Sequence, residues 1–281
     1  MENPTITQLQ NRKSIRQFTG EAIKDADLEL IFKTAQRAPT SINAQQISLV
    51  YTRDKAKLAR IAELCGGQAH VAKADVFVGI VIDFNRTSAV AESLGKHQVI
   101  EQSAEGIMIG AVEAGVMLKH LQSAAEALGY GTTCLGSVRN SMEEFITLFN
   151  LPKKTLLLVG TTIGVPTEQA KNAPLKPRVA LDSFVMEDRY DSDKVRSSAL
   201  TYEKEFKEFR EKTGSSAVPS YSEKIVSNYT DGFYRKTSTT FQAQGFSFKD
   251  EYHKEEGDTS FFTKNILHFR YNTPPKIFTH T

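Results

Sequence analysis

The chain contains 281 residues, of which 40% are hydrophobic and 24% are charged, and its formal net charge is +2 at pH 7. This length suits one large domain or two small ones, and the near balance of charge argues against nucleic acid as the main partner. The two cysteines, Cys65 and Cys134, have neither metal-ligand spacing nor the pattern of a disulfide framework. We therefore expect no metal site.

Residues 1–12 are polar and contain no hydrophobic signal segment, so we expect no secretory signal. The most apolar helical stretch, 106–118, is interrupted by Glu113 and is too short to cross a bilayer. We expect a cytoplasmic protein without a membrane partner, and reduced cysteines.

Hydrophobic spacing predicts strands that alternate with helices, which is typical of an α/β or α+β sheet protein. The continuous β-branched run at 76–82 indicates a strand covered on both faces. In chain order we predict a helix over 25–38, a strand over 47–52, a helix over 54–64, a strand over 76–82, a long helix over 103–128, a strand over 131–138, a short helix capped by Asn140, a strand over 155–163, a polar helix over 191–212 and a further helix over 222–244.

The predicted helix over 103–128 is apolar on nearly all sides. Such a helix lies inside a molecule or inside an oligomer, because no face of it suits water. We therefore expect it to be buried within the chain or in a dimer.

Two short segments concentrate positive charge. Residues 12–16 read Arg-Lys-Ser-Ile-Arg, and residues 175–178 read Leu-Lys-Pro-Arg. An arginine fork can grip two phosphate oxygens, and a serine hydroxyl adds a donor. The alternatives are a solvated basic turn and a surface loop, since runs of charge usually face water.

Three polar or glycine-rich links are further candidates for ligand contact. Residues 39–45 read PTSINAQ, residues 66–70 read GGQAH, and residues 129–137 form a glycine-rich turn into a strand. Each could be a simple turn, and His70 could be a proton donor or a structural residue. The sequence has no Walker loop, GxGxxG, GxSxG or HExxH motif, so side chains would have to bind any phosphate.

Taken together, these segments resemble one family. RKSIR, PTSINAQ, GGQAH, LGYGTTCLGSVRN and LKPR occur in the order seen in the oxygen-insensitive nitroreductases and the NADPH-dependent flavin reductases. The resemblance runs from about Thr5 to about Phe248, and the GGQ and LKPR elements favour the larger, flavin-reductase-like branch.

The resemblance implies an α+β sandwich with a central mixed sheet flanked by helices, in an intertwined homodimer with FMN at the subunit interface. It implies one FMN-binding domain over residues 1–248, which includes a helical excursion over 191–244. The extension over 249–281 matches nothing in the family.

The resemblance also assigns roles to residues. No protein side chain is expected to be catalytic, because the flavin carries the chemistry, but Arg16 is the candidate for stabilising the reduced flavin. The residues expected to bind the cofactor are Arg12, Lys13, Ser14 and Arg16 of the first basic segment, Lys176 and Arg178 of the second, Thr40, Ser41 and Gln45 along the ribityl chain and ring, and Gln68, Cys134, Leu135, Gly136 and Ser137 beside the ring.

The implied activity is hydride transfer from NADPH or NADH through FMN to a small acceptor, such as free flavin, a quinone, a nitroaromatic, an azo dye or chromate. Two alternatives stay open: an enzyme of the same fold with different chemistry, such as dehalogenation, and a non-catalytic FMN-binding protein. The loop at 213–221 contains no Arg or Lys, so we expect weak discrimination between NADPH and NADH unless Arg139 or Arg235 reaches the site.

Overall fold

The computed structural model describes residues 3–230 and 237–249, in which four strands form one sheet in the order β1-β2-β4-β3. Every neighbouring pair is antiparallel, so the prediction of a mixed sheet is wrong. The mixed sheet was implied by the family resemblance, but in the described residues the connections between sheet neighbours bring each strand back in the opposite direction. The strands are β1 (Ile47–Thr52), β2 (Val76–Asp83), β3 (Gly131–Leu135) and β4 (Thr155–Gly164).

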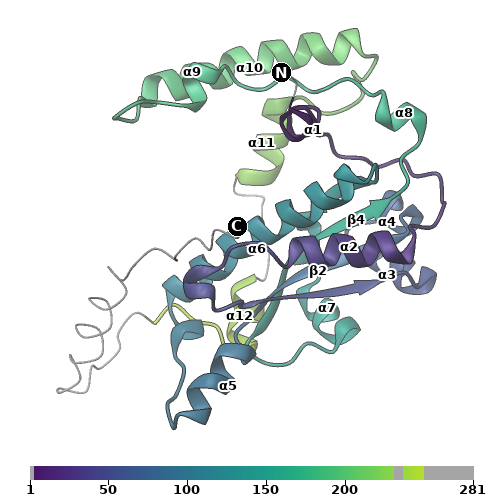
Figure 1. The fold of residues 1–281 in the computed structure, drawn as a ribbon. Helices are drawn as coiled ribbons and strands as arrows, with labels where there is room; N and C mark the ends of the chain where they lie inside the picture. Colours follow the sequence, from purple (N-terminus) through teal and green to yellow (C-terminus); the bar gives the residue numbers. More distant parts are fainter. Residues whose placement is uncertain (1–2, 231–236, 250–281) are drawn as a thin grey trace, which may run out of the picture.

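Helices surround the sheet and continue beyond it (Figure 1). Those in the described residues are α1 (Pro4–Gln10), α2 (Asp25–Ala35), α3 (Lys55–Leu64), α4 (Ala69–Lys73), α5 (Asn85–Ser93), α6 (Ala104–Ala127), α7 (Met142–Phe149), α8 (Glu168–Lys171), α9 (Leu181–Phe184), α10 (Ser192–Lys212), α11 (Tyr221–Tyr229) and α12 (Thr237–Ala243), with 3-10 turns η1 (Ser41–Asn43), η2 (Ile100–Gln102) and η3 (Gly136–Asn140).

The central strand β2 separates two hydrophobic cores. Its Val78 and Ile80 pack with α2 and α6, whereas Phe77 and Val81 pack with α3, α4 and α7. This alternation follows from the period of two along a strand. The sheet therefore lies between two helical layers, as the sandwich prediction requires.

A β-bulge in β4 positions the turn η3. The register between β2 and β4 passes from Ile80 opposite Val159 to Val81 opposite Leu157, which leaves Leu158 out of the ladder. Arg139 of η3 donates from Nη1 to the Leu158 carbonyl at 2.9 Å. The bulge thus fixes η3 against the sheet.

Helix α6 buries only part of its apolar surface within the chain. Ser103 caps it by accepting from the Gly106 amide at 3.0 Å, and Ala114 and Leu121 are fully buried. On another face, Met108 is 55% exposed and Val112 is 65% exposed. The chain alone therefore leaves an apolar face of α6 uncovered.

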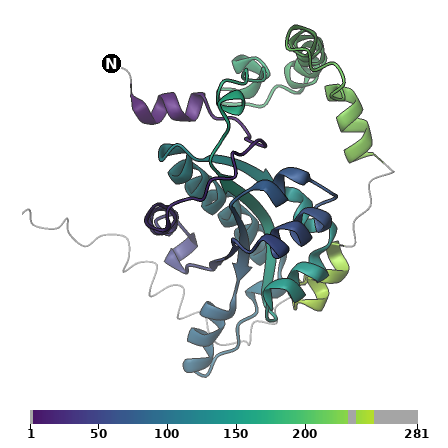
Figure 2. The ribbon, with the colours of Figure 1, turned by 90° about the vertical axis from the view of Figure 1, so that its right-hand side faces the viewer.

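Helices α9, α10 and α11 form a group that stands away from the sheet in both views (Figures 1 and 2). Phe206 of α10 is 4% exposed, and the Lys224 ammonium of α11 lies 4.7 Å from the centre of its ring. This group therefore has a small core of its own.

Some predicted boundaries differ from the structure. The predicted helix over 222–244 is divided into α11 and α12, with residues 231–236 outside the described residues. The strand predicted over 131–138 ends at Leu135, because the chain turns into η3. Ser141, rather than Asn140, occupies the N-cap position of α7. Helices α1, α4, α5, α8 and α9 were not predicted.

Within residues 3–230 and 237–249, no helix is long and apolar enough to cross a membrane. The same part of the chain contains no group of three or more His, Cys, Asp or Glu side chains that could hold a metal ion.

Candidate functional site

Two cationic segments that are far apart in the sequence line one cavity of about 660 Å³. This volume lies within the range typical of small-molecule sites. The predicted residues on its wall are Arg12, Lys13, Ser14, Arg16, Lys176 and Arg178.

The first segment is held in an extended form along the sheet edge. The Ile15 amide donates to the Thr132 carbonyl at 2.8 Å, and the Thr133 hydroxyl donates to the Ile15 carbonyl. The Ile15 side chain is buried against Gly131, where a Cβ would lie 2.6 Å from it. Because side chains alternate along extended backbone, Ser14 and Arg16 point away from the core and toward the cavity.

The second segment is tied to the first by Lys13. Its ammonium donates to the Lys171 carbonyl at 2.8 Å and to the Ala173 carbonyl at 2.6 Å. At the other end, the Tyr202 hydroxyl donates to the Pro177 carbonyl at 3.3 Å. These contacts hold the backbone on both sides of Lys176.

The charges in the cavity suit an anion. Desolvation lowers the pKa of the Arg16 guanidinium, and the charge of Arg12 lowers it further. Desolvation also lowers the pKa of the Lys176 ammonium, and the charges of Arg16 and Arg178 add to this effect. Cations that destabilise one another are relieved by an anion between them, and guanidinium groups bind phosphate oxygens in pairs. The donor set therefore fits the phosphate of FMN.

The Gln68 side chain joins two of the predicted links. It donates from Nε2 to the Ser137 hydroxyl at 2.7 Å and to the Cys65 carbonyl at 2.8 Å. Desolvation raises the pKa of the Cys134 thiol, although the nearby charges of Arg12 and Arg139 oppose the effect. A protonated thiol is a weak nucleophile, so Cys134 is not suited to covalent catalysis.

His70 adjoins the same region. Desolvation lowers the pKa of its ring, and the charge of Arg16 lowers it further, so the imidazole is neutral at pH 7. Its Nε2 atom is buried and has no hydrogen-bond partner among the described residues. A neutral ring favours a role other than proton donor.

Thr40, Ser41 and Gln45 do not line the cavity. They follow α2, whereas the first cationic segment precedes it, and an 11-residue helix is about 16 Å long. Their loop has left-handed backbone at Ile42, Asn43 and Gln45, with φ of 50°, 56° and 54°. Such strain costs about 1–3 kcal/mol per residue and persists where contacts or a ligand stabilise it.

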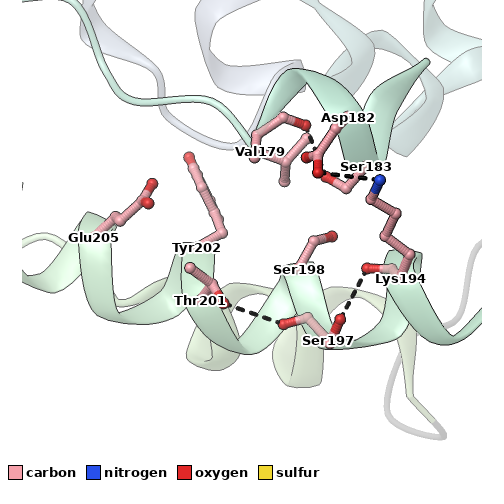
Figure 3. Close-up of a pocket in the computed structure, with 10 residues that line it drawn as sticks. Val179, Asp182, Ser183, Lys194, Ser197, Ser198, Thr201, Tyr202 and Glu205 are labelled. Atoms are coloured by element: carbon pink, nitrogen blue, oxygen red, sulfur yellow. Dashed lines mark hydrogen bonds and ion pairs between the residues drawn. The ribbon is translucent and has the colours of Figure 1, made fainter.

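A second, smaller cavity of about 180 Å³ lies between α9 and α10 (Figure 3). The Lys194 ammonium pairs with the Asp182 carboxylate across one end at 3.0 Å, and Tyr202 stands at the other. None of the predicted cofactor residues lines it. Because Val179 on its wall directly follows Arg178, this cavity adjoins the cationic segment rather than forming part of it.

The sequence and the fold match those of a known family of proteins. Residues 9–165 match the Nitroreductase family, and residues 176–249 match the Nitroreductase family, C-terminal domain. The chain belongs to the nitroreductase family and is an NAD(P)H-dependent oxidoreductase of the FMN reductase and nitroreductase type.

Individual relatives show which members of the family this chain resembles. The chain is 33% identical to FMN reductase [NAD(P)H] of Bacillus subtilis over 246 residues, 87% of this chain and 98% of that protein. It is 36% identical to the oxygen-insensitive NADPH nitroreductase of Salmonella typhimurium over 190 residues, 67% of this chain and 75% of the relative. The solved structure of NfrA2 from B. megaterium superposes with a TM-score of 0.83 at 31% identity and covers 88% of this chain and 100% of its own. The chain is therefore similar to flavin reductases along most of its length.

Proposed function

We propose that this chain binds one FMN and uses NADPH or NADH to reduce small acceptors, such as free flavin, quinones and nitroaromatics, in a ping-pong cycle. The observation that supports this proposal best is the convergence of Arg12, Ser14, Arg16, Lys176 and Arg178 on one cavity. They would hold the phosphate, while Gln68 and the 134–137 loop would lie beside the ring.

Bound FMN would accept a hydride from the nicotinamide and pass it to the acceptor. The protein would orient the ring and offset negative charge that develops on it. Arg16 is our candidate for the latter, because it lies in the cavity beside Arg12 and is partly desolvated there. The protonated Cys134 thiol and the neutral His70 ring leave the redox step to the cofactor.

We also propose a homodimer in which the Thr40–Gln45 loop of one subunit completes the site of the other. Within one chain this loop does not reach the cationic cavity. Its Ile42 side chain is 94% exposed, and the uncovered face of α6 contains Met108 and Val112. A second copy that covered this face would remove apolar surface from water and could bring the loop to the neighbouring flavin.

The test is spectroscopic. The purified protein should be yellow, and NADPH or NADH should bleach it without oxygen. A quinone, a nitroaromatic or chromate should then restore the colour over many turnovers. Bleaching without turnover on any acceptor would favour different chemistry on the same fold, and a yellow protein that neither nicotinamide bleaches would favour a non-catalytic FMN-binding protein.

A further inference from the structure

One buried carboxyl group ties together both ends of the strained loop. Glu113 of α6 is 6% exposed, and its Oε1 atom accepts from the Ser41 amide at 2.6 Å and from the Gln46 side-chain Nε2 at 2.8 Å. Ser41 lies at the start of the loop, and Gln46 follows its last residue, Gln45. A single oxygen atom therefore closes the loop.

The second carboxyl oxygen of Glu113 and the side-chain oxygen of Gln46 are buried without a hydrogen-bond donor. Neither Glu113 Oε2 nor Gln46 Oε1 has a hydrogen-bond partner among the described residues. An ionised carboxylate would leave one of its oxygens bare in a water-excluded position, which is costly. A protonated carboxyl would instead use Oε1 as the carbonyl that accepts two bonds and Oε2 as a hydroxyl that donates to the Gln46 amide oxygen.

We propose that Glu113 is a neutral carboxylic acid that pairs with the Gln46 side-chain amide through two hydrogen bonds, and that this pair positions the Thr40–Gln45 loop for its contacts with flavin. Burial also raises the pKa of the Glu113 carboxyl, and the Ser41 amide opposes the rise only in part. The link to flavin rests on the proposed function, whereas the protonation state of Glu113 does not.

Several charged groups on the neighbouring elements have partners other than the Glu113 carboxyl. On α2, Asp25 pairs with Arg53, Asp27 accepts from Tyr130, and Glu29 pairs with Lys33. On the other elements that pack here, Arg86 of α5 donates to the Gln45 carbonyl, Asp83 of β2 accepts from the Ser48 hydroxyl, and Glu101 of η2 pairs with Lys154.

The proposal predicts which substitution is tolerated. Glu113→Gln places an amide where the acid stood and keeps both bonds to Gln46, so the affinity for FMN should stay within about threefold. Glu113→Ala removes the link between the loop ends and should weaken FMN binding by about tenfold or more. Glu143→Gln, at an exposed position of α7 and away from the uncovered face of α6, is the control.

Infrared difference spectroscopy reads the protonation state directly. The wild-type spectrum at pH 7 minus that of Glu113→Gln should contain a carboxylic-acid C=O stretch, whereas the wild-type spectrum minus that of Glu143→Gln should contain a carboxylate signal. Because the pKa is raised in the folded state, the contribution of Glu113 to stability is full below its ordinary pKa of 4.5 and is lost as the pH rises through the folded pKa. As the pH rises from the ordinary pKa to the folded pKa, the melting temperature of Glu113→Gln should therefore increase relative to that of the wild type.

A carboxylate band for Glu113 at pH 7 would overturn the proposal, and so would a Glu113→Gln variant that loses as much FMN affinity as Glu113→Ala. If the wild type bound no FMN, the proposed function would fail, but the infrared band and the melting curves would still decide the state of Glu113.

Discussion

The ammonium of Lys13 lies 2.6 Å from the carbonyl of Ala173, 160 positions further along the chain. With its second bond, to the Lys171 carbonyl at 2.8 Å, this side chain joins the two cationic segments. Lys13 also lines the cavity, so we expect it to position the second segment for binding as well as to add charge.

Removing the donors of Lys13 should therefore weaken FMN binding through Lys176. We expect Lys13→Met and Lys176→Met each to lower FMN affinity by about ten- to hundredfold, and the double variant to lose less than the two effects combined. Titration of the apoprotein with FMN measures all three. Lys171→Met is the control, because this exposed side chain pairs with Glu168 and should not change the affinity. Fully additive losses would show that Lys13 acts independently of the second segment.

Arg16 and Arg178 should be required to retain the cofactor. Loss of one charge-assisted bond to phosphate costs about 1.5–3 kcal/mol, or roughly ten- to hundredfold in affinity. Arg16→Ala and Arg178→Ala should purify pale or colourless, whereas Arg60→Ala, which removes an exposed arginine paired with Glu63 on α3, should stay yellow. Two fully yellow variants with unchanged dissociation constants would refute this phosphate site.

A charge on the uncovered face of α6 should dissociate the dimer. Val112→Glu places a carboxylate where the proposed interface excludes water, so light scattering should show monomers, with FMN lost in parallel. Val90→Glu on α5 is a close control, because Val90 is 60% exposed and Val112 is 65% exposed. A Val112→Glu protein that remained dimeric and yellow would place the interface elsewhere.

The C-terminal extension should be dispensable up to a definite residue. A chain ending at Phe248 should keep its colour and its melting temperature. A chain ending at Gly245 should be much less stable, because it lacks Phe246, which is 1% exposed, and the loss of a buried Phe side chain costs about 3–5 kcal/mol. If the chain ending at Phe248 lost both colour and solubility, the extension, whose residues 250–281 lie outside the described part, would be structural.

Discrimination between NADPH and NADH should be below about tenfold, or roughly 1.4 kcal/mol. The segment 213–221 has no cation of its own, Arg210 at the end of α10 donates to the Ser216 carbonyl at 2.5 Å, and Arg139 is bonded to Leu158. The measurement is kcat/KM for both donors with one quinone. A preference for NADPH of about a hundredfold would contradict this prediction, and substitution of Arg139, Lys212 and Arg235 in turn would then identify the cation responsible. Arg235 lies outside the described residues.

The strands and most helices could be predicted because their signals are local. The β-branched run at 76–82 marks β2, and the apolar 103–128 stretch marks α6 to within a residue at each end. Strand direction could not be predicted, because it depends on how the connections return. The break before α12 was missed, although the Thr-rich 237–240 run is a weak helix former.

The cationic part of the site could also be predicted from the sequence, because 12–16 and 176–178 combine positive charge with a serine or a proline. The way in which the two segments meet could not be predicted, because Lys13 bonds to backbone carbonyls, and every residue type has a backbone carbonyl. Glu113 was visible only as an acid interrupting an apolar helix. Its pairing with Gln46 depends on a tertiary contact that no spacing encodes.

The order β1-β2-β4-β3 also has a consequence during synthesis. β2 ends at Asp83, but the neighbour that completes it, β4, begins only at Thr155. At ribosomal speeds of about 5–20 residues per second, the 71 intervening residues (84–154) leave one edge of this very apolar strand unpaired for about 4–14 seconds. Until β4 emerges, that edge is a template for the wrong partner, so the nascent chain is most exposed to aggregation while α6 is being made.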